Sequence, residues 1–336
     1  MVATEAEARE VFRLRHRVFV HEQGRRGEGI DPERGELRSK LDAFSHLWHA
    51  RDGKTVVGTV TQTMICPHFD VALLPTGLEL EPFRAEAGLV GYSSRFAIEP
   101  GHRGKWVLAS LARHTYAHGR RLGAKFDFMT ANPALVPLYE RLGYVRYTAS
   151  GIQVTGIGLL IPMVLSATDL AYLRTVRSAC LPAAEHFAAE PEWGEWLRAA
   201  HPIIGRYYHA DLRPERHVAH LERRFGLPVR LAEELGAMSF VHQFPAGTTL
   251  LREGDRVSCV FIALQGTLGA GRARDVDADE RTPRRAGDGV AFARDAVRCA
   301  TDAVVLCLPM MAVTRLQRRY PEYSGRLEEL VGSSAS

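Results

Sequence analysis

The run of residues 90–144 constrains the fold more than any other part of the chain. It reads as a strand, VGYSSRFAIEP, followed by the turn GHRG, a helix, a second strand, KFDFMTANP, and the segment ALVPLYERLGY. A strand that leads through a glycine-flanked turn into a helix presents several unpaired backbone N–H groups, which can bind a phosphate. The helix after the second strand brings Tyr139 towards the end of the first strand. We therefore expect a phosphorylated carrier whose reactive end lies between two strands.

Length, charge and cysteine content limit the class of protein. The 336 residues suffice for two domains, and 46% hydrophobic with 24% charged residues is ordinary for a globular protein. A net charge of +4, without a long basic block, does not favour nucleic acid as a partner. The five cysteines lack metal-ligand spacing, so we expect free thiols and no metal. We find no signal peptide or membrane span in the sequence and predict a soluble, cytoplasmic protein.

The first half of the chain has the element order of a mixed α/β domain. Residues 4–20 have apolar side chains at helical spacing, and the Asp52-Gly53 pair is typical of a hairpin turn between two strands. This order predicts an α/β (α+β) domain over residues 1–175, with a mixed central sheet and flanking helices. The strands expected outside the run 90–144 are 45–50, 55–63, 151–155 and 157–165, with an irregular segment over 66–88.

Two further parts are expected after this domain. Residues 176–235 read as a helical bridge, which several prolines divide into short helices. Residues 236–336 read as an all-β roll that ends in a basic helix over 311–330. The sequence of the bridge contains no catalytic or binding motif, so we expect its residues to have a packing role.

The all-β part resembles the β-roll of cyclic-nucleotide-binding domains in the segments FPAGTTLLREGD and VFIALQGTL. In such domains a glycine and a glutamate open a short phosphate-binding cassette, and an arginine closes it. The corresponding stretch, 287–295, is too short, has no glutamate, and offers only Arg294 or Arg298, out of register. A buried phosphate would be poorly paired there. We expect a degenerate roll that packs, forms a homodimer or docks a partner; a nucleotide sensor is the alternative.

The run 90–144 resembles the GNAT superfamily of N-acyltransferases, which move an acyl group from a pantetheine thioester to an amine. In that superfamily the strand before the turn has a bulge, whose free backbone groups hold pantetheine and polarise the thioester carbonyl. The turn holds the pyrophosphate or carrier phosphate. The resemblance implies an acyl-CoA or acyl carrier protein thioester as the donor. The implied donor contacts are Phe96, Ala97, Ile98, His102, Arg103, Gly104, Lys105, Trp106, Val107 and Asn132.

Two residues of the run matter most for this resemblance. The superfamily turn has a second glycine where this chain has the bulky Trp106. Tyr139 lies in PALVPLYERLGY, which matches the superfamily pattern Asn…Leu-Tyr-Glu-x-x-Gly. The resemblance implies that the Tyr139 hydroxyl bonds to the pantetheine sulfur and protonates the leaving thiolate. A packing role in the core is the alternative for both residues.

Two more segments, LRHRVF followed by HEQG, and SRFAI, narrow the resemblance. They are similar to the branch that contains acyl-homoserine-lactone synthases and N-acyl amino acid synthases. Those enzymes place long acyl chains, often from acyl carrier protein, on amino acid-type amines. The resemblance extends over residues 8–175 and implies acceptor or carrier contacts by Arg17, Phe19, Asp42 and Arg95. Arginine suits a carboxylate acceptor, because its planar fork binds two oxygens at once.

The reaction also requires a base. In the lactone synthases a glutamate lies two residues before Ser-Arg-Phe, where this chain has Tyr92. An ammonium cannot attack a thioester, so a base is still needed. His46 is the candidate with the most suitable pKa. A water chain to solvent and Glu22 are the alternatives.

Together these features predict direct transfer of a fatty or polyketide acyl group to the amine of an amino acid, a peptide or an amino metabolite. Residues 66–88 and 151–165 are expected to shape the acyl pocket. Two alternatives stay open at this point. One is an acetyltransferase gated by a cyclic nucleotide, and the other is a non-catalytic protein that binds an acyl carrier or a peptide.

Overall fold

The computed structural model describes residues 5–104, 106–154, 156–204, 214–271, 293 and 295–332. The chain divides into two compact units, each built from separate stretches. The first unit contains Met1–Thr130, Tyr139–Val145 and Pro162–Pro202. The second contains Ala131–Leu138, Arg146–Ile161 and Ile203–Ser336.

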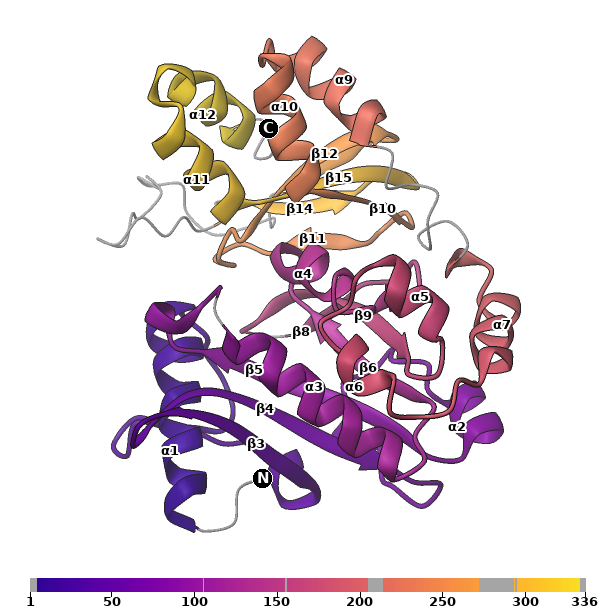
Figure 1. Cartoon of the computed structure of the whole chain (residues 1–336). Coiled ribbons are helices and arrows are strands. Elements are labelled where there is room, and N and C mark those ends of the chain that lie inside the picture. The colour runs from indigo at the N-terminus through magenta and orange to yellow at the C-terminus, as the bar shows by residue number, and fades with distance from the viewer. Residues whose placement is uncertain are drawn as a thin grey trace. The chain divides into compact units, whose positions relative to one another are not determined.

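The first unit is built on a twisted sheet, whose strands come along the chain in the sequence of elements that we predicted (Figure 1). Strands β3 and β4 form the expected hairpin, β5 continues it antiparallel, and β6 lies parallel to β5. The sheet is therefore mixed, as predicted. The strand order is β3-β4-β5-β6-β9-β7, and β8, which lies in the second unit, pairs with the part of β9 that belongs to the same unit. The bounds are β3 Ser45–Asp52, β4 Thr55–Ile65, β5 Val90–Ile98, β6 Phe126–Ala131, β7 Val145–Arg146, β8 Ile152–Val154 and β9 Gly158–Ser166.

Two helices cover opposite faces of this sheet (Figure 1). Helix α1, Glu5–Arg15, packs against Val56 of β4, whereas α3, Trp106–Arg121, packs against the next residue, Val57. Successive side chains of a strand point to opposite faces, so the two clusters lie on different sides. The predicted helix 4–20 is confirmed, but its second part, His16–Glu22, is wound as a π-helix.

The remaining elements of the first unit are short. Residues 66–88, expected to be irregular, contain a 3₁₀ turn and helix α2. Leu80 precedes α2 and Pro82 occupies its first turn, where a proline is tolerated because that N–H has no intrahelical partner. The bounds are β1 Ile30–Asp31, β2 Glu36–Leu37, α2 Glu81–Ala87, α4 Val136–Glu140, α5 Leu170–Thr175, α6 Leu181–Ala184 and α7 Pro191–Ala200; of these, all but the first part of α4 belong to this unit.

The second unit contains two three-stranded antiparallel sheets, ordered β10-β15-β12 and β11-β14-β13. A cluster of buried leucines and valines joins the first of these sheets to its helices. The predicted basic helix 311–330 is wrong as a single helix, because Pro321 separates α11 from α12. The bounds are α9 Pro214–Phe225, α10 Val229–Met238, β10 Phe240–Phe244, β11 Thr249–Leu251, β12 Cys259–Gln265, β13 Leu268–Gly271, β14 Ala296–Cys299, β15 Ala303–Pro309, α11 Met310–Arg319 and α12 Ser324–Gly332.

All five cysteines are free thiols, and only Cys66 is exposed. Of the helices that the structure describes, none has both the length and the apolar content needed to cross a bilayer.

Candidate active site

Strands β5 and β6 separate after a short parallel ladder. Gly91 pairs with Asp127 and Tyr92 with Phe128, and the described residues form no further pair between these strands. Strand β5 nevertheless stays paired with β4 as far as Ile98. The edge of β5 that faces β6 therefore presents backbone groups with no strand partner beyond Tyr92. The prediction of two parted strands is confirmed.

A bulge lies in β5 within the separated part. Thr61 of β4 pairs with Ser94, but Thr59 pairs with Ala97, so two residues, Arg95 and Phe96, oppose one residue of β4. Arg95 has φ +54°, which is strained for a residue with a side chain and turns the backbone locally. The bulge expected from the superfamily is thus present at Arg95–Phe96.

The predicted donor contacts around the bulge have different surroundings. Phe96 lies in the bulge, whereas Ala97 and Ile98 are again paired with β4. The Ile98 carbonyl accepts a hydrogen bond from Arg103 Nε at 3.1 Å. The Arg95 guanidinium is half-buried, and its Nη1 has no hydrogen-bond partner among the described residues.

The turn before α3 is held by contacts with distant segments. Arg103 Nη1 donates to Glu22 Oε1 at 2.6 Å, so Glu22, a weak base candidate, is engaged in an ion pair. His102 Nε2 lies 3.1 Å from Asp52 Oδ2. Gly104 has φ +71°, a left-handed conformation that glycine adopts without strain.

Helix α3 begins beside this turn. Trp106, its first residue, is 52% exposed and does not line the pocket described below, so its indole does not fill that pocket. The side chain of Val107 is fully buried against Gly58 of β4. Lys105, another predicted contact, lies outside the described residues. The first N–H groups of α3 lack intrahelical acceptors and carry the positive end of the helix dipole.

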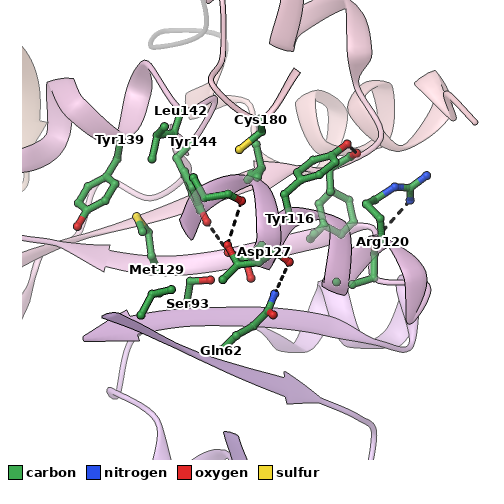
Figure 2. A pocket seen from close by; sticks show the side chains of 18 of the residues that line it. Gln62, Ser93, Tyr116, Arg120, Asp127, Met129, Tyr139, Leu142, Tyr144 and Cys180 are labelled. Carbon is green, nitrogen blue, oxygen red and sulfur yellow. Dashed lines mark hydrogen bonds between the residues drawn. The ribbon is translucent and has the colours of Figure 1, made fainter. Parts of the chain in front are cut away.

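A pocket lies where β5 and β6 diverge, beneath α3. Its cavity volume is about 30 Å³, which is room for one or two water molecules. Side chains from β4, β5, β6 and α3 line it, together with residues 139–144 and the end of β9 (Figure 2). Of the predicted site residues, the pocket brings together Tyr139 and Phe96.

Tyr139 lies in α4, and its side chain forms part of the pocket wall. Its side chain is 5% exposed, and its ring lies edge-on to that of Tyr144, with centroids 6.3 Å apart. The hydroxyl makes no hydrogen bond with any residue in the described part of the chain. Burial raises the pKa of Tyr139, which keeps the phenol protonated at neutral pH. A protonated, uncommitted phenol in the pocket wall is able to donate a proton or a hydrogen bond.

Asp127 is a pocket residue that the sequence analysis missed. The Tyr144 hydroxyl donates to its Oδ2, and Ser93 of β5 lies beside it (Figure 2). Burial raises the pKa of Asp127 to about 6, against the lowering effect of the Tyr144 and Ser93 hydroxyls. A signal for it exists in the sequence, since Asp127 is a charged residue within the otherwise apolar strand FDFMTA.

His46, the predicted base, does not line the pocket. Its ring lies 4.3 Å from that of His118 on α3, and His118 Nδ1 is 2.9 Å from Gln62 Oε1. Gln62, which does line the pocket, donates from Nε2 to the Thr115 carbonyl. His46 is thus linked to the pocket only through His118 and Gln62. No group of three or more His, Cys, Asp or Glu side chains in the described ranges is arranged to hold a metal ion.

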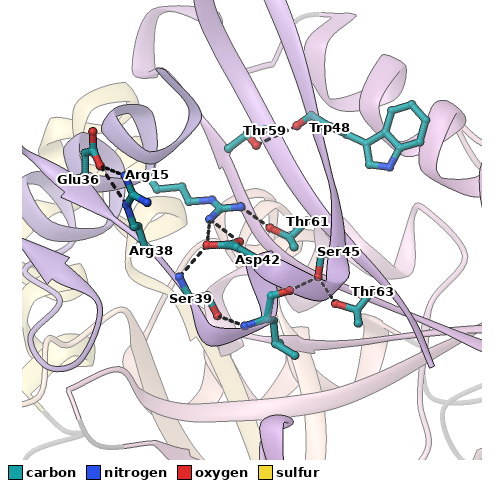
Figure 3. Close-up of polar contacts among 11 residues, drawn as sticks. Arg15, Glu36, Arg38, Ser39, Asp42, Ser45, Trp48, Thr59, Thr61 and Thr63 are labelled. Atoms are coloured by element: carbon teal, nitrogen blue, oxygen red, sulfur yellow. Dashed lines mark hydrogen bonds and ion pairs between the residues drawn. The ribbon is translucent and has the colours of Figure 1, made fainter. Parts of the chain in front are cut away.

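Asp42 forms an ion pair inside the first unit (Figure 3). Its two oxygens accept from Arg15 Nη1 at 2.8 and 3.0 Å, and Arg15 is fully buried. Asp42 also accepts from the Ser39 backbone N–H at 2.7 Å, completing a capping box. These contacts give Asp42 a structural role, and the sequence analysis did not identify Arg15.

The other predicted residues are also engaged within their own units. Arg17 pairs with Glu99 at 2.9 Å, in an exposed position. Phe19 packs against the apolar cluster beneath α1. In the second unit, Asn132 Oδ1 accepts from the Ala134 N–H and from Ser258 Oγ, each at 3.0 Å.

A comparison with protein-family models finds a match to a family of acyltransferases. The family model "N-acyl amino acid synthase FeeM" matches residues 10–169. A comparison with curated proteins gave no match. The family match supports an N-acyltransferase enzyme.

Solved structures similar to this chain cover about half of it. FeeM, an N-acyl amino acid synthase from uncultured soil microbes, is 16% identical, with 49% of this chain and 89% of that chain covered and a TM-score of 0.41. BjaI, a CoA-dependent acyl-homoserine lactone synthase, is 15% identical, with 55% of this chain and 93% of that chain covered and a TM-score of 0.37. An acyl-CoA N-acyltransferase from Pseudomonas aeruginosa is 19% identical, with 48% of this chain and 92% of that chain covered and a TM-score of 0.34.

Proposed function

We propose that this protein transfers an acyl group from a pantetheine thioester, carried by coenzyme A or by an acyl carrier protein, to the amine of an amino acid, a peptide or an amino metabolite. The observation that carries this proposal is the separation of β5 from β6 after Tyr92 and Phe128, with a pocket at the split. An extended pantetheine arm can bond to the open edge of β5, as an added strand would.

The donor would lie along β5 with its phosphates at the start of α3. The free N–H groups and the dipole of this 16-residue helix favour an anion there. Arg103 is paired with Glu22, so the backbone rather than that guanidinium would make the principal phosphate contacts. The thioester would then lie near the bulge at Arg95 and Phe96, where a backbone N–H can stabilise the oxyanion.

The reaction proceeds by direct attack. The neutral amine nitrogen forms a bond to the thioester carbon, the C–S bond breaks, and the nitrogen loses a proton to a base. Tyr139 donates its hydroxyl proton to the departing sulfur and is later reprotonated from solvent. His46 would act only through His118 and Gln62, so a water chain in the pocket is the more direct route for the amine proton.

Incubation of the full chain with acyl-CoA and acyl carrier protein thioesters of increasing length, together with a mixture of amino acids, tests the proposal. We expect release of free thiol in step with an N-acyl product detected by mass spectrometry. An absence of thiol release from every thioester, with the protein folded, would contradict the proposal.

We also propose that residues 1–175, 176–235 and 236–336 act as the acyltransferase domain, a helical bridge and a degenerate cyclic-nucleotide-binding-like roll. The two small sheets of the second unit support a β-rich C-terminal part. The stretch 287–295 lies largely outside the described residues, and so does Arg294. We expect cyclic AMP and cyclic GMP to leave the melting temperature unchanged, since the cassette lacks a glutamate. A shift would favour the gated alternative.

A further inference from the structure

The cavity at the split between β5 and β6 is small and nearly closed. Its volume of about 30 Å³ is enough for one or two water molecules. Of the residues that line it, all except Phe96 and Asp127 are buried. Phe96 lies in the bulge, so the cavity borders the place where the thioester carbonyl would bind. An acyl chain that enters the cavity therefore has room for one or two carbon groups beyond its carbonyl.

The cavity ends among close-packed side chains. The closed end of the split lies at the pair of Gly91 with Asp127. A Cβ on residue 91 would clash with Asp127 Oδ1, so the carboxylate packs directly over the glycine. Met129 of β6 and Leu142, which follows α4, also line the cavity and are 4% and 5% exposed (Figure 2). These side chains occupy the space that a longer chain would need.

Hydrogen bonds hold other parts of the wall in place. The Tyr144 hydroxyl donates to Asp127 Oδ2, and Gln62 Nε2 donates to the Thr115 carbonyl. Widening the cavity would disturb these buried contacts. An extra methylene in a close-packed interior forces side chains away from their preferred rotamers. We therefore expect the wall to resist a longer chain.

We propose that the acyl group transferred by this enzyme is short, namely an acetyl or a propionyl group. A methyl group is about the size of a water molecule, so either group fills the cavity, whereas a chain of eight carbons does not fit. This differs from the fatty or polyketide chain expected from the sequence. The inference rests on the proposed function, because it assumes a thioester donor with its carbonyl at the bulge.

Straight-chain thioesters of coenzyme A and of an acyl carrier protein, with two to twelve carbons, test the inference. Each is incubated with the full-length protein and a mixture of amino acids, and kcat/KM is measured from thiol release. We expect the largest kcat/KM at two or three carbons and a value at least about 10-fold lower at eight carbons. A maximum at four carbons or more would overturn the inference and leave the acyltransferase intact.

Removing a side chain from the cavity wall should admit a longer chain. In Met129→Ala we expect kcat/KM for the six-carbon thioester, relative to the acetyl thioester, to rise about 10-fold. Met163→Ala is the matched control, since Met163 is a fully buried methionine of β9 that does not line the cavity. The control should keep the wild-type ratio. An unaltered ratio in folded Met129→Ala, or an equal rise in the control, would contradict the inference.

The remaining outcomes separate the two proposals. Should Met129→Ala not fold, Leu142→Ala removes a second residue of the wall, and an unaltered ratio in that variant overturns the inference instead. If no thioester of any length releases thiol, the proposed function fails, and the same thioesters are compared by their effect on the melting temperature. A larger shift with the acetyl or propionyl thioester would then support the inference. A shift with the eight-carbon thioester that equals or exceeds it would overturn the inference as well.

Discussion

Tyr92 in β5 lies opposite Phe128 in β6, and this pair is the last that joins the two strands in the described part of the chain. Strand β4 remains paired with β5 beyond that point, so the opening affects only one edge of β5. The pocket and Tyr139 lie at this opening. Changes at this edge, or in the helix above it, should therefore act on donor binding and turnover.

Tyr139→Phe removes the hydroxyl that we assign to protonation of the leaving thiolate. We expect kcat to fall about 10²-fold, a typical contribution of general acid catalysis, with little change in donor affinity. Steady-state thiol release and equilibrium binding of a donor analogue measure the two effects. Tyr172→Phe, a buried tyrosine on α5 outside the pocket, is the matched control and should keep wild-type kcat. An unchanged kcat in Tyr139→Phe would show that the Tyr139 hydroxyl does not protonate the leaving thiolate.

Gly58→Ala should loosen the packing of α3 on the sheet. A Cβ at this position would clash with Val107 Cγ1 and lie 3.2 Å from Leu111 Cδ1. We expect the free energy of unfolding to fall by about 1–3 kcal/mol, measured by urea denaturation. Gly101→Ala is the control, since a Cβ there would meet no atom within 4 Å and should change little. Equal effects in the two variants would contradict this packing argument.

Asp42→Ala would leave the Arg15 guanidinium buried without its carboxylate. Removing one partner of a buried ion pair costs about 3–5 kcal/mol, and we expect a loss of this size in urea denaturation. Arg17→Ala breaks the exposed pair with Glu99 and should cost less than about 1 kcal/mol. If Asp42→Ala were stable but had a raised KM for the amine, Asp42 would be an acceptor contact instead.

Asp127→Asn should stabilise the protein above pH 6 and have little effect near pH 4. The pKa of Asp127 is about 6 in the folded protein and has an ordinary value of 3.8. Between these values the unfolded chain loses its proton while the folded protein keeps it, so stability falls as pH rises and stays lowered above 6. The gain at pH 7.5 should approach about 3 kcal/mol at most. The same difference between variant and wild type at pH 4.5 and 7.5 would refute this linkage.

His242 should make the second unit sensitive to acid. Burial, and then the charge of Arg146, lower its pKa to about 3 from 6.5, and its Nε2 lies 3.2 Å from the Ala149 carbonyl. Below pH 6.5 this histidine takes up a proton in the unfolded chain but stays neutral in the folded unit. The free energy of unfolding therefore falls, by about 2 kcal/mol at pH 5. Hydrogen-exchange protection of β10 and β15 at pH 7 and 5 measures this loss. The His242→Gln variant should lose less protection between pH 7 and 5 than the wild type. An equal loss in the variant and the wild type would contradict the role of His242 in this acid sensitivity.

Local patterns were sufficient for most of the architecture. The strand Val90–Ile98, the helix after the turn and the β3–β4 hairpin all follow from periodicity and turn residues, which act over a few positions. The single C-terminal helix over 311–330 was wrong, although the proline at position 321 is visible in the sequence. The motif around Tyr139 was also enough to select a residue that the structure places in the pocket.

The sequence by itself determined the order of elements and the position of Tyr139, because hydrophobic spacing records which face of each element is buried. The tertiary structure alone decided the partners of the charged residues. Asp42 pairs with Arg15, 27 positions away, and Arg103 with Glu22, 81 positions away. It also placed Asp127 at the closed end of the split, since a strand's pattern does not tell where its neighbour separates from it. Such contacts depend on how distant segments pack, and no local period encodes that.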